Sequence, residues 1–467
     1  MKRIFSILFI FFPSLLFAQS ITQKLQTAFT QFEKDPQLTY AISALYVIDA
    51  KTGKVIFEKN ARVGMAPAST QKIITSVTAF ELLKKDYRYE TKLQAVGNIV
   101  DTVLQGNLHI VGDGDPTFGS SRYSNTKSNL VLNAFVAAVQ KKGIKQITQP
   151  MSFNYRNYPY QTIPDGWIMQ DIGNYYGAAA SILNWKENQF DIVLNSVKDK
   201  TKDDEVTVVS PTNKTFINEL KAGPKGSGDN AYCYLPMQGN AWVLTGSIPV
   251  GEQKFTISAA DNEAAKTMLS DLSFALKQKQ IKTNGMEDYK AILAKPKINA
   301  IDGRQYEDLY THYSPALDSI IYWFNKKSIN LYGEALLKTM GNIEKANADS
   351  GVAVIKSFWA KKNIDKNELN IFDGSGLSPL NRVTTHAQVE ILKYAATKDW
   401  YNNFLQALPI YNGMTMKSGS ITNVKGFCGY HIAKNGNSYI FSFLVNNFNG
   451  KGGDVAGKMF KVLDVLK

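Results

Sequence analysis

Hydrophobic and polar positions divide the chain into three regions of different character. Near the start, residues 20–34 have the spacing of a helix, and residues 41–48 and 55–58 have the pattern of two strands joined by a turn. From about residue 88 to residue 298, short strand-like runs are separated by Gly, Asn and Pro, with few helical stretches. From about residue 299 the helical spacing returns. The pattern therefore predicts a mixed α/β chain with a β-rich region in its middle.

The last part of the chain has the pattern of a sheet meander followed by a helix. Residues 415–421, 426–433 and 438–446 alternate between apolar and polar side chains, with an Asn-Gly hairpin signal between the last two runs. Residues 454–467 have the pattern of an amphipathic helix. Such a helix can lie on a membrane surface, which would be at most a peripheral association. We expect it to pack on the sheet instead.

The two outer regions are expected to form one domain. A chain of 467 residues is too long for a single ordinary core. Residues 19–87 and 299–467 together have the size of one α/β domain, in which helices flank an antiparallel sheet. Residues 88–298 would then be a β-rich insertion, formed by one large domain or by two nested domains.

The start of the chain has the pattern of a secretory signal peptide. Lys2 and Arg3 precede an apolar run over residues 4–17, which is shorter than the roughly 20 residues that cross a bilayer. We expect cleavage after Ala18, so that residues 1–18 are removed and the mature protein is exported. An uncleaved anchor is the alternative.

The composition narrows the functional classes. The net charge of +13 suits anionic cell-wall polymers or lipid head groups, although a generally lysine-rich surface explains it as well. No dense block of Lys and Arg with interleaved aromatic residues indicates a nucleic-acid partner. Cys233 and Cys428 can form one disulfide or remain two buried thiols. No metal or cofactor is expected, because zinc-peptidase spacing is absent among the four histidines, His109, His312, His386 and His431.

Three short motifs carry the candidate chemistry, and each occurs twice. Ser69 and Lys72, of the form S-x-x-K, begin an apolar helix, where residues three apart share a face and the amine can approach the hydroxyl. The second copy, Ser124 and Lys127, lies in a polar stretch that has the pattern of a loop. A serine at a helix start is also an ordinary N-cap, so this motif alone leaves both interpretations open.

The other two motifs are distinguished in the same way. Ser328-Ile329-Asn330 falls between two predicted helices, where side chains two apart can face one cleft, whereas residues 152–154 lie in the β-rich region. Lys417-Ser418-Gly419 enters a strand, whereas residues 51–53 lie in a hairpin turn that needs Gly for its backbone. Only one copy of each motif is on the element that its chemistry requires. That ordered set is typical of the serine acyl-transfer enzymes that bind penicillin.

With these motifs the chain resembles the D-alanyl-D-alanine carboxypeptidase/endopeptidase family of low-molecular-mass class C penicillin-binding proteins, the penicillin-binding protein 4 type. The large insertion between the first two motifs is typical of that family, and five longer segments also resemble it: residues 67–72, 112–117, 171–177, 312–315 and 373–378. The resemblance implies a penicilloyl-serine-transferase (β-lactamase-like) fold. It also implies hydrolysis of D-Ala-D-X bonds in peptidoglycan peptides, covalent inhibition by β-lactams and a place in the periplasm.

The resemblance further implies roles for the motif residues. Ser69 would be the nucleophile and Lys72 the base that activates it. Ser328 would relay a proton to the leaving amine, with Asn330 and Lys417 orienting it and binding substrate.

Four further residues would bind the substrate. Ser418 would hold its terminal carboxylate, and Gly419 would let its backbone approach the strand closely. The backbone N–H groups of Ser69 and Ser420 would form an oxyanion hole. Asp171, in the inserted region, would contact the amino end of a diamino-acid side chain.

Two other functions stay open at this level. A β-lactamase or esterase of the same fold is suggested by Glu368-Leu369-Asn370, which faintly resembles a deacylating-glutamate loop, although we expect an ordinary surface turn there. A non-catalytic peptidoglycan-binding scaffold is suggested by the basic charge and the large insertion. The balance of carboxypeptidase and endopeptidase activity and the oligomeric state are not predicted.

Overall fold

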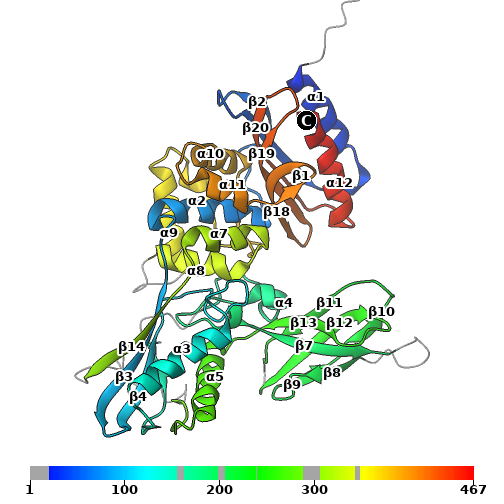
Figure 1. Cartoon of the computed structure of the whole chain (residues 1–467). Coiled ribbons are helices and arrows are strands. Elements are labelled where there is room, and N and C mark those ends of the chain that lie inside the picture. Colours follow the sequence, from blue (N-terminus) through cyan, green and yellow to red (C-terminus); the bar gives the residue numbers. More distant parts are fainter. Residues whose placement is uncertain (1–19, 155–161, 198–205, 238, 288–304, 342–347) are drawn as a thin grey trace, which may run out of the picture.

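The computed structural model describes residues 20–154, 162–197, 206–237, 239–287, 305–341 and 348–467. The expected signal peptide, residues 1–18, lies outside this part of the chain. Figure 1 shows an elongated molecule, with a mixed α/β part at one end and two β-rich parts at the other. The predicted class, an α/β fold with helices flanking an antiparallel sheet and a β-rich region in addition, is confirmed.

Segments from both ends of the chain share one antiparallel sheet. Its strands are β1 (Ile42–Asp49), β2 (Val55–Lys59), β17 (Ile410–Tyr411), β18 (Met414–Ile421), β19 (Val424–Ile432) and β20 (Ser438–Asn446). The order is β17-β18-β19-β20-β1-β2, so that β1 pairs with β20 over its whole length. Because side chains alternate along a strand, Leu45 and Val47 of β1 pack on one face and Tyr46 and Ile48 on the other.

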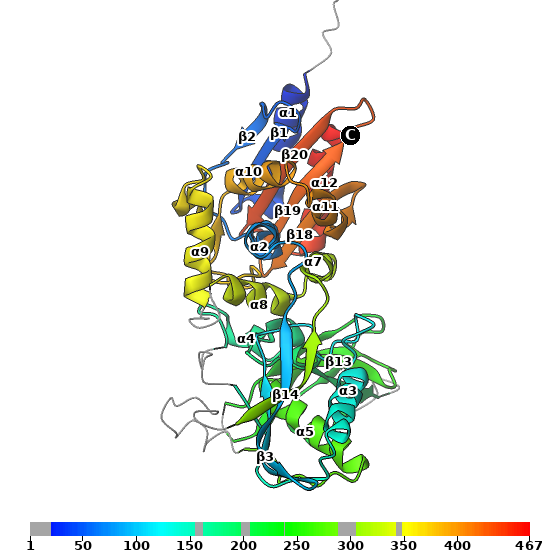
Figure 2. The same cartoon turned by 60° about the vertical axis from the view of Figure 1, so that its left-hand side comes forward.

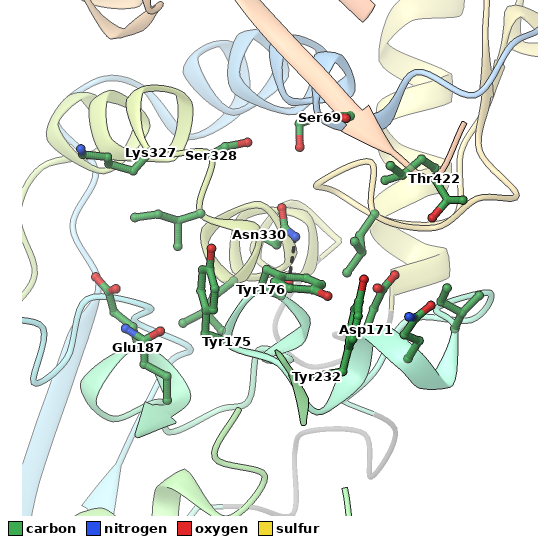
Figure 3. Close-up of a pocket in the computed structure, with 18 of the residues that line it drawn as sticks. Ser69, Asp171, Tyr175, Tyr176, Glu187, Tyr232, Lys327, Ser328, Asn330 and Thr422 are labelled. Atoms are coloured by element: carbon green, nitrogen blue, oxygen red, sulfur yellow. Dashed lines mark hydrogen bonds between the residues drawn. The ribbon is translucent and has the colours of Figure 1, made fainter. Parts of the chain in front are cut away.

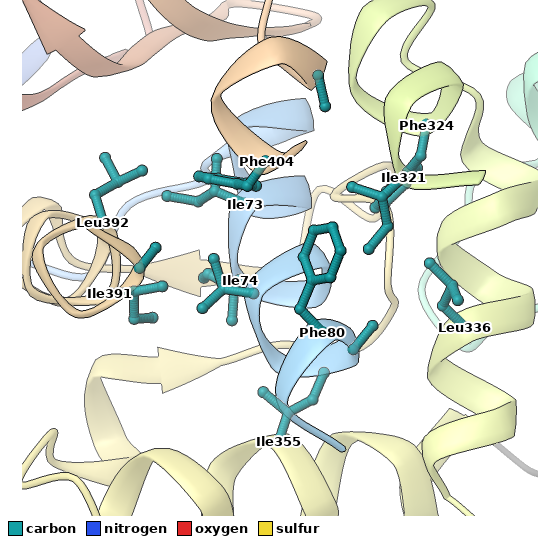
Figure 4. Close-up of a cluster of buried hydrophobic side chains, with 14 of the residues drawn as sticks. Ile73, Ile74, Phe80, Ile321, Phe324, Leu336, Ile355, Ile391, Leu392 and Phe404 are labelled. Carbon is teal, nitrogen blue, oxygen red and sulfur yellow. The ribbon is translucent and has the colours of Figure 1, made fainter. Parts of the chain in front are cut away.

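Helices cover both faces of this sheet (Figures 1 and 2). The first and last α-helices of the described residues, α1 (Ile21–Glu33) and α12 (Gly452–Leu463), pack on one face, as expected for the amphipathic C-terminal helix. The helices on the other side are α2 (Lys72–Leu83), α7 (Leu317–Lys326), α8 (Asn330–Met340), α9 (Ala348–Ala360), α10 (Thr385–Ala395) and α11 (Tyr401–Ala407). Helix α2 is at their centre, and Figure 4 shows Ile73, Ile74 and Phe80 surrounded by the apolar side chains of its neighbours. The helix that follows Ser69 is therefore held on all sides.

The first β-rich part is a five-stranded sheet with two helices against it. Its strands are β3 (Glu90–Val100), β4 (Val103–Val111), β5 (Gln146–Ile147), β6 (Ser152–Phe153) and β14 (Tyr306–Tyr313), and its helices are α3 (Ser128–Lys141) and α5 (Ala264–Gln278). Strand β14 pairs with β3, although it lies beyond residue 298. The expected division of the chain at residues 88–298 stays a prediction.

The second β-rich part consists of two small sheets around one apolar cluster. The three-stranded sheet contains β7 (Gln189–Ser196), β8 (Val206–Ser210) and β13 (Phe255–Ala260). The four-stranded sheet contains β9 (Thr215–Asn218), β10 (Lys221–Gly223), β11 (Asn230–Tyr234) and β12 (Ala241–Pro249). The remaining elements are short: η1 (Pro36–Leu38), η2 (Ala68–Gln71), α4 (Met169–Ile172), η4 (Tyr175–Gly177), η5 (Lys186–Asn188), η7 (Lys366–Glu368), β15 (Leu369–Asn370), β16 (Arg382–Val383) and η8 (Asp464–Leu466).

Three questions left by the composition concern cysteines, metals and membranes. Cys233 and Cys428 are both free and buried, so the disulfide alternative does not apply. Among the described residues, no three or more His, Cys, Asp and Glu side chains gather into a group that could hold a metal ion. None of the helices described here has the length and apolar character to cross a membrane.

Candidate active site

Ser69 lies in η2, the short 3-10 helix that runs directly into α2. The preceding residue, Ala68, has a left-handed φ of 46°, which is uncommon for a residue with a side chain. Ser69 is half-buried and lines a cavity of about 430 Å³. The expected helix start is thus present, with one tight turn inserted before the regular helix.

The amine of Lys72 contacts three oxygen atoms. Its Nζ lies 2.9 Å from Ser69 Oγ, 2.6 Å from Asn330 Oδ1 and 2.7 Å from the carbonyl oxygen of Ser375. The Lys72 side chain is fully buried. Burial, reinforced by the positive charge of Lys417, lowers the pKa of Lys72 well below its usual value.

The carbonyl of Ser375 belongs to a loop that many hydrogen bonds hold in place. Thr75 Oγ1 donates to the carbonyl of Gly374 at 2.6 Å, and the Gly374 N–H donates to the Glu334 carboxyl at 3.0 Å. The Asp373 carboxyl accepts from the backbone N–H of Gly376 at 2.8 Å. The sequence did not predict that this loop contacts Lys72, although residues 373–378 resemble a segment of the family.

Glu334 is a further residue that the sequence did not single out. It is fully buried in α8, and burial raises its pKa to about 8. Lys338, one turn along the same helix, donates to the carbonyls of Thr162 at 2.9 Å and Ala180 at 2.7 Å. In the sequence the two residues have only the spacing of an ordinary i,i+4 surface pair, which gives no signal of burial.

Ser328 and Asn330 reach the same cleft because of the turn between α7 and α8. Ser328 has a left-handed φ of 56°, and Asn330 is the first residue of α8. The Asn330 side chain donates from Nδ2 to the carbonyl of Tyr176 at 2.8 Å, so that Oδ1 faces Lys72. The structure thus brings the second motif against the first, as expected from a connection between two helices.

Strand β18 carries the third motif along the opposite wall. Lys417 is buried, and its Nζ donates to Ser328 Oγ at 3.1 Å and to the carbonyl of Ser418 at 2.8 Å. Burial lowers the pKa of Lys417 to about 7. A Cβ added to Gly419 would lie 2.6 Å from the Pro67 carbonyl and 3.0 Å from the Ser69 nitrogen. Close packing of β18 against the Ser69 turn therefore accounts for the glycine, rather than only the expected approach of a substrate.

The remaining expected substrate residues lie at different depths. Ser420 is exposed, and it lines the cavity together with Ser69, Ser328 and Asn330. Ser418 lies on β18 and is half-buried. Asp171 lines the cavity from the inserted region, and burial raises its pKa, while a hydrogen bond from Tyr176 opposes that shift. Figure 3 shows Asp171 at one end of the cavity, with Ser69 above the middle.

Comparison with known proteins gives the same family as the motifs. A family model described as the D-Ala-D-Ala carboxypeptidase 3 (S13) family matches residues 25–414. The chain belongs to this family. The S13 match confirms the resemblance inferred from the motifs and, with it, the class of serine-type D-Ala-D-Ala carboxypeptidases, which are hydrolases.

Individual relatives of this S13 chain are distant in sequence but similar in length and fold. A D-alanyl-D-alanine carboxypeptidase from Actinomadura sp. strain R39 is 25% identical, over 89% of this chain and 80% of that protein. D-alanyl-D-alanine carboxypeptidase DacB from Haemophilus influenzae is 24% identical, over 87% of this chain and 85% of that protein. The crystal structure of penicillin binding protein 4 from Haemophilus influenzae has the same fold. Its TM-score is 0.78 at 19% identity, over 94% of this chain and 98% of the other.

The second copies of the motifs have structural roles in this S13 chain. Lys127 pairs with Gly119 in an isolated bridge before α3, and Ser152 is buried, with its Oγ 2.7 Å from His109 Nδ1. Gly53 has a left-handed φ of 72° in the turn between β1 and β2. None of these three residues lines the described cavity.

Glu368, the candidate deacylating glutamate, does not lie in the expected surface turn. Glu368 is buried, and its carboxylate accepts from Arg62 Nη1 at 2.7 Å and lies 2.9 Å from His386 Nδ1. The expectation of an exposed turn was wrong, because Arg62, which is 306 positions away in sequence, and His386 of α10 both contact the carboxylate. Glu368 holds these elements together and does not line the cavity.

Proposed function

We propose that this carboxypeptidase removes the terminal D-Ala of peptidoglycan stem peptides through an acyl intermediate on Ser69. The observation that carries the proposal is the 2.9 Å contact between Lys72 Nζ and Ser69 Oγ at the wall of the cavity. A serine hydroxyl is a weak nucleophile until a neighbouring base accepts its proton. Membership of the S13 family supplies the substrate class.

Lys72 is assigned as that base because of how its three contacts differ. A neutral amine has N–H groups to donate and one lone pair to accept a proton. Asn330 Oδ1 and the Ser375 carbonyl can only accept, so they take two N–H groups and leave the lone pair for the Ser69 hydroxyl. The lowered pKa of Lys72 favours this neutral form near neutral pH.

Ser328 and Lys417 are assigned to the departure of the leaving group. Ser69 Oγ bonds to the carbonyl carbon while its proton moves to Lys72, which gives a tetrahedral oxyanion. The carbon–nitrogen bond then breaks, and Ser328, held by Lys417 at 3.1 Å, relays the proton from Lys72 to the leaving amine, which returns Lys72 to its neutral form. Water hydrolyses the ester in a second round of the same proton transfers.

Residues of β18 and the inserted region are assigned to substrate binding. Ser418 would hold the terminal carboxylate, close to the cation of Lys417. The backbone N–H groups of Ser69 and Ser420 would stabilise the oxyanion. Gly419 allows β18 to lie close to the Ser69 turn. Asp171 would bind the amine of a diamino-acid side chain, since it is the carboxylate at its end of the cavity.

Three finer statements belong to the same proposal. The mature enzyme would be exported to the periplasm after loss of residues 1–18. Residues 88–298 would form an insertion into a catalytic domain of residues 19–87 and 299–467. Cleavage of cross-links between two stem peptides would use the same groups as release of D-Ala.

A fluorescent penicillin tests the proposal directly. The mature protein should become labelled, and Ser69→Ala should abolish labelling while the variant keeps its thermal unfolding transition. Labelling that persists in this folded variant would overturn the assignment of Ser69.

The same assay separates the alternatives. Fast turnover of penicillin in place of a long-lived acyl-enzyme would favour a β-lactamase. Binding to peptidoglycan without release of D-alanine or of cleaved dimers would favour a scaffold.

A further inference from the structure

The cavity has two ends of opposite charge, with Ser69 between them. Asp171 is at one end, and Figure 3 shows Lys327 and Glu187 at the other. Arg122 also lines this second end. The proposed function assigns a role to Asp171 but none to Arg122, Lys327 and Glu187.

Arg122 is held rigidly by a buried carboxylate. Its Nε donates to both carboxylate oxygens of Glu187, at 2.8 and 3.1 Å. Glu187 Oε1 also accepts from Ser120 Oγ at 2.7 Å and from the Tyr332 hydroxyl at 2.8 Å. The Arg122 guanidinium also lies 5.8 Å from the centre of the Trp323 ring. These contacts fix the position of the guanidinium at the cavity wall.

The backbone that carries Glu187 has an unusual conformation. Lys186, Glu187 and Asn188 have successive left-handed φ values of 52°, 57° and 51°. Residues other than glycine rarely adopt this region, and such positions concentrate at functional sites. Asn188 stabilises the turn, because its Oδ1 accepts from the Trp185 N–H at 2.9 Å and its Nδ2 donates to the Ala179 carbonyl at 2.8 Å.

The cations at this end retain donors that face no protein partner. The ion pair with Glu187 uses Nε of Arg122, and within the described part of the chain no hydrogen bond uses its Nη nitrogens. The Arg122 side chain is 29% exposed to solvent. Lys327 is exposed and forms no ion pair with the residues that the structure describes. Two cations and one carboxylate leave this end positively charged, with N–H groups that are free to bind a carboxylate.

The neighbouring residue shows which part of a substrate would lie here. Lys327 directly precedes Ser328, the residue assigned to protonate the leaving amine. Asp171 is assigned to the diamino acid of the stem peptide, which stays on the acyl side when the terminal D-Ala leaves, and it lies at the opposite end of the cavity. The positively charged end is therefore on the leaving-group side of the bond that is cleaved.

We propose that Arg122 and Lys327 form a binding subsite for an additional carboxylate on the leaving peptide. This inference rests on the proposed function and extends it to cross-linked substrates. The carboxylate next to the cleaved nitrogen is assigned to Ser418, so a free D-Ala has none left for this subsite. A leaving stem peptide has further carboxylates, and these are the ligands that Arg122 and Lys327 would bind.

Two matched dimers test the subsite. Both contain the same acyl stem and the same leaving stem, and both keep the carboxylate next to the cleaved nitrogen. In one dimer the other carboxylates of the leaving stem are free, and in the other they are amidated. The wild-type kcat/KM should be about tenfold higher for the free-acid dimer, since hydrogen bonds to charged groups contribute more than neutral ones.

Three variants make the test specific. Lys327→Gln and Arg122→Gln should each reduce that preference severalfold, and the double variant should bring it close to one. Lys434→Gln removes the same charge from the exposed turn between β19 and β20, outside the cavity, and should keep the wild-type preference. Because Arg122→Gln leaves Glu187 without its cation and can lower stability, Lys327→Gln is the deciding variant.

The outcomes separate this inference from the proposed function. Equal rates for the two dimers in the wild type, or an unchanged preference in Lys327→Gln, would overturn the subsite. So would a wild-type enzyme that releases D-Ala but cleaves neither dimer. Failure to release D-Ala or to become labelled by penicillin would instead overturn the proposed function.

Discussion

Asn330 accepts a hydrogen bond from Lys72 at 2.6 Å. The other end of the same amide donates to the carbonyl of Tyr176 at 2.8 Å, so the inserted region determines which atom of Asn330 faces the lysine. An amide oxygen, unlike a carboxylate, brings no negative charge that would raise the pKa of the amine. Burial and the charge of Lys417 can therefore lower the pKa of Lys72 toward the neutral state that the proposed base needs.

Asn330→Asp should therefore shift the pH dependence of acylation. The substitution keeps the shape of the side chain but places a negative charge beside Lys72, which raises the pKa of the amine. The rising limb of the pH profile for penicillin acylation should move up by about 1–3 pH units, as is usual for an opposite charge at this distance. Stopped-flow acylation rates across pH would measure it. A profile with lower rates but an unshifted limb would contradict the assignment of Lys72 as the base.

Lys417 should give the pH profile its falling limb. Burial lowers its pKa to about 7, so the cation is lost as the pH rises through that value, and with it the binding of a carboxylate. The positive charge of Lys425 contributes to this lowering. Lys425→Gln should therefore move the falling limb of kcat/KM for D-Ala release to higher pH. Lys434→Gln, which removes a distant charge, is the control, and an equal shift in both variants would reject the local effect.

Gly419→Ala should damage the active site by steric means. The added Cβ would lie 2.6 Å from the Pro67 carbonyl and 2.9 Å from the Thr70 nitrogen, so either β18 or the Ser69 turn must move. We expect a loss of about 1–3 kcal/mol in the free energy of unfolding, together with slower acylation. Chemical denaturation and penicillin labelling would measure the two effects.

Gly453→Ala is the matched control for that experiment. Gly453 lies in α12, and a Cβ there meets no atom within 4 Å. Alanine is favoured over glycine in helices by roughly 0.5–1 kcal/mol, so this variant should be as stable as the wild type or more stable. Equal behaviour of the two alanine variants would mean that the close approach at Gly419 has no consequence.

The sequence predicted most elements of the α/β part that carries the motifs, because local patterns and packing agree there. The first helix was expected at residues 20–34 and forms at Ile21–Glu33, and the C-terminal meander forms β18, β19 and β20. Helix α11 (Tyr401–Ala407) was missed, since seven residues are too few for a clear helical period. The partner of β3 was also missed, because β14 is about two hundred residues away in sequence and strand pairing at that distance leaves no local signal.

The residues around the reacting groups were predicted unequally. The motifs identified Ser69, Lys72, Ser328, Asn330 and Lys417. In the structure Lys72 is hydrogen-bonded to Ser69 and Asn330, and Lys417 is hydrogen-bonded to Ser328. The carbonyl of Ser375 and the carboxyl of Glu334 were not identified. A backbone carbonyl has no residue-type signature, and a glutamate in a helix is normally exposed. The burial of Glu368, expected at the surface, was misjudged for the same reason.

The sequence by itself determined the candidate reactive groups and the elements that carry them. Residues that are three or four apart share one face of a helix, so the spacing of Ser69 and Lys72 predicts that their side chains meet. Only the tertiary structure decided what surrounds them, because contacts between Lys72 and Ser375, or between Asn330 and Tyr176, depend on the packing of distant segments. The charges at the two ends of the cavity arose in the same way, since Arg122, Asp171 and Lys327 come from separate parts of the chain. Local periodicity describes a face of one element, whereas a binding site is formed where the faces of several elements meet.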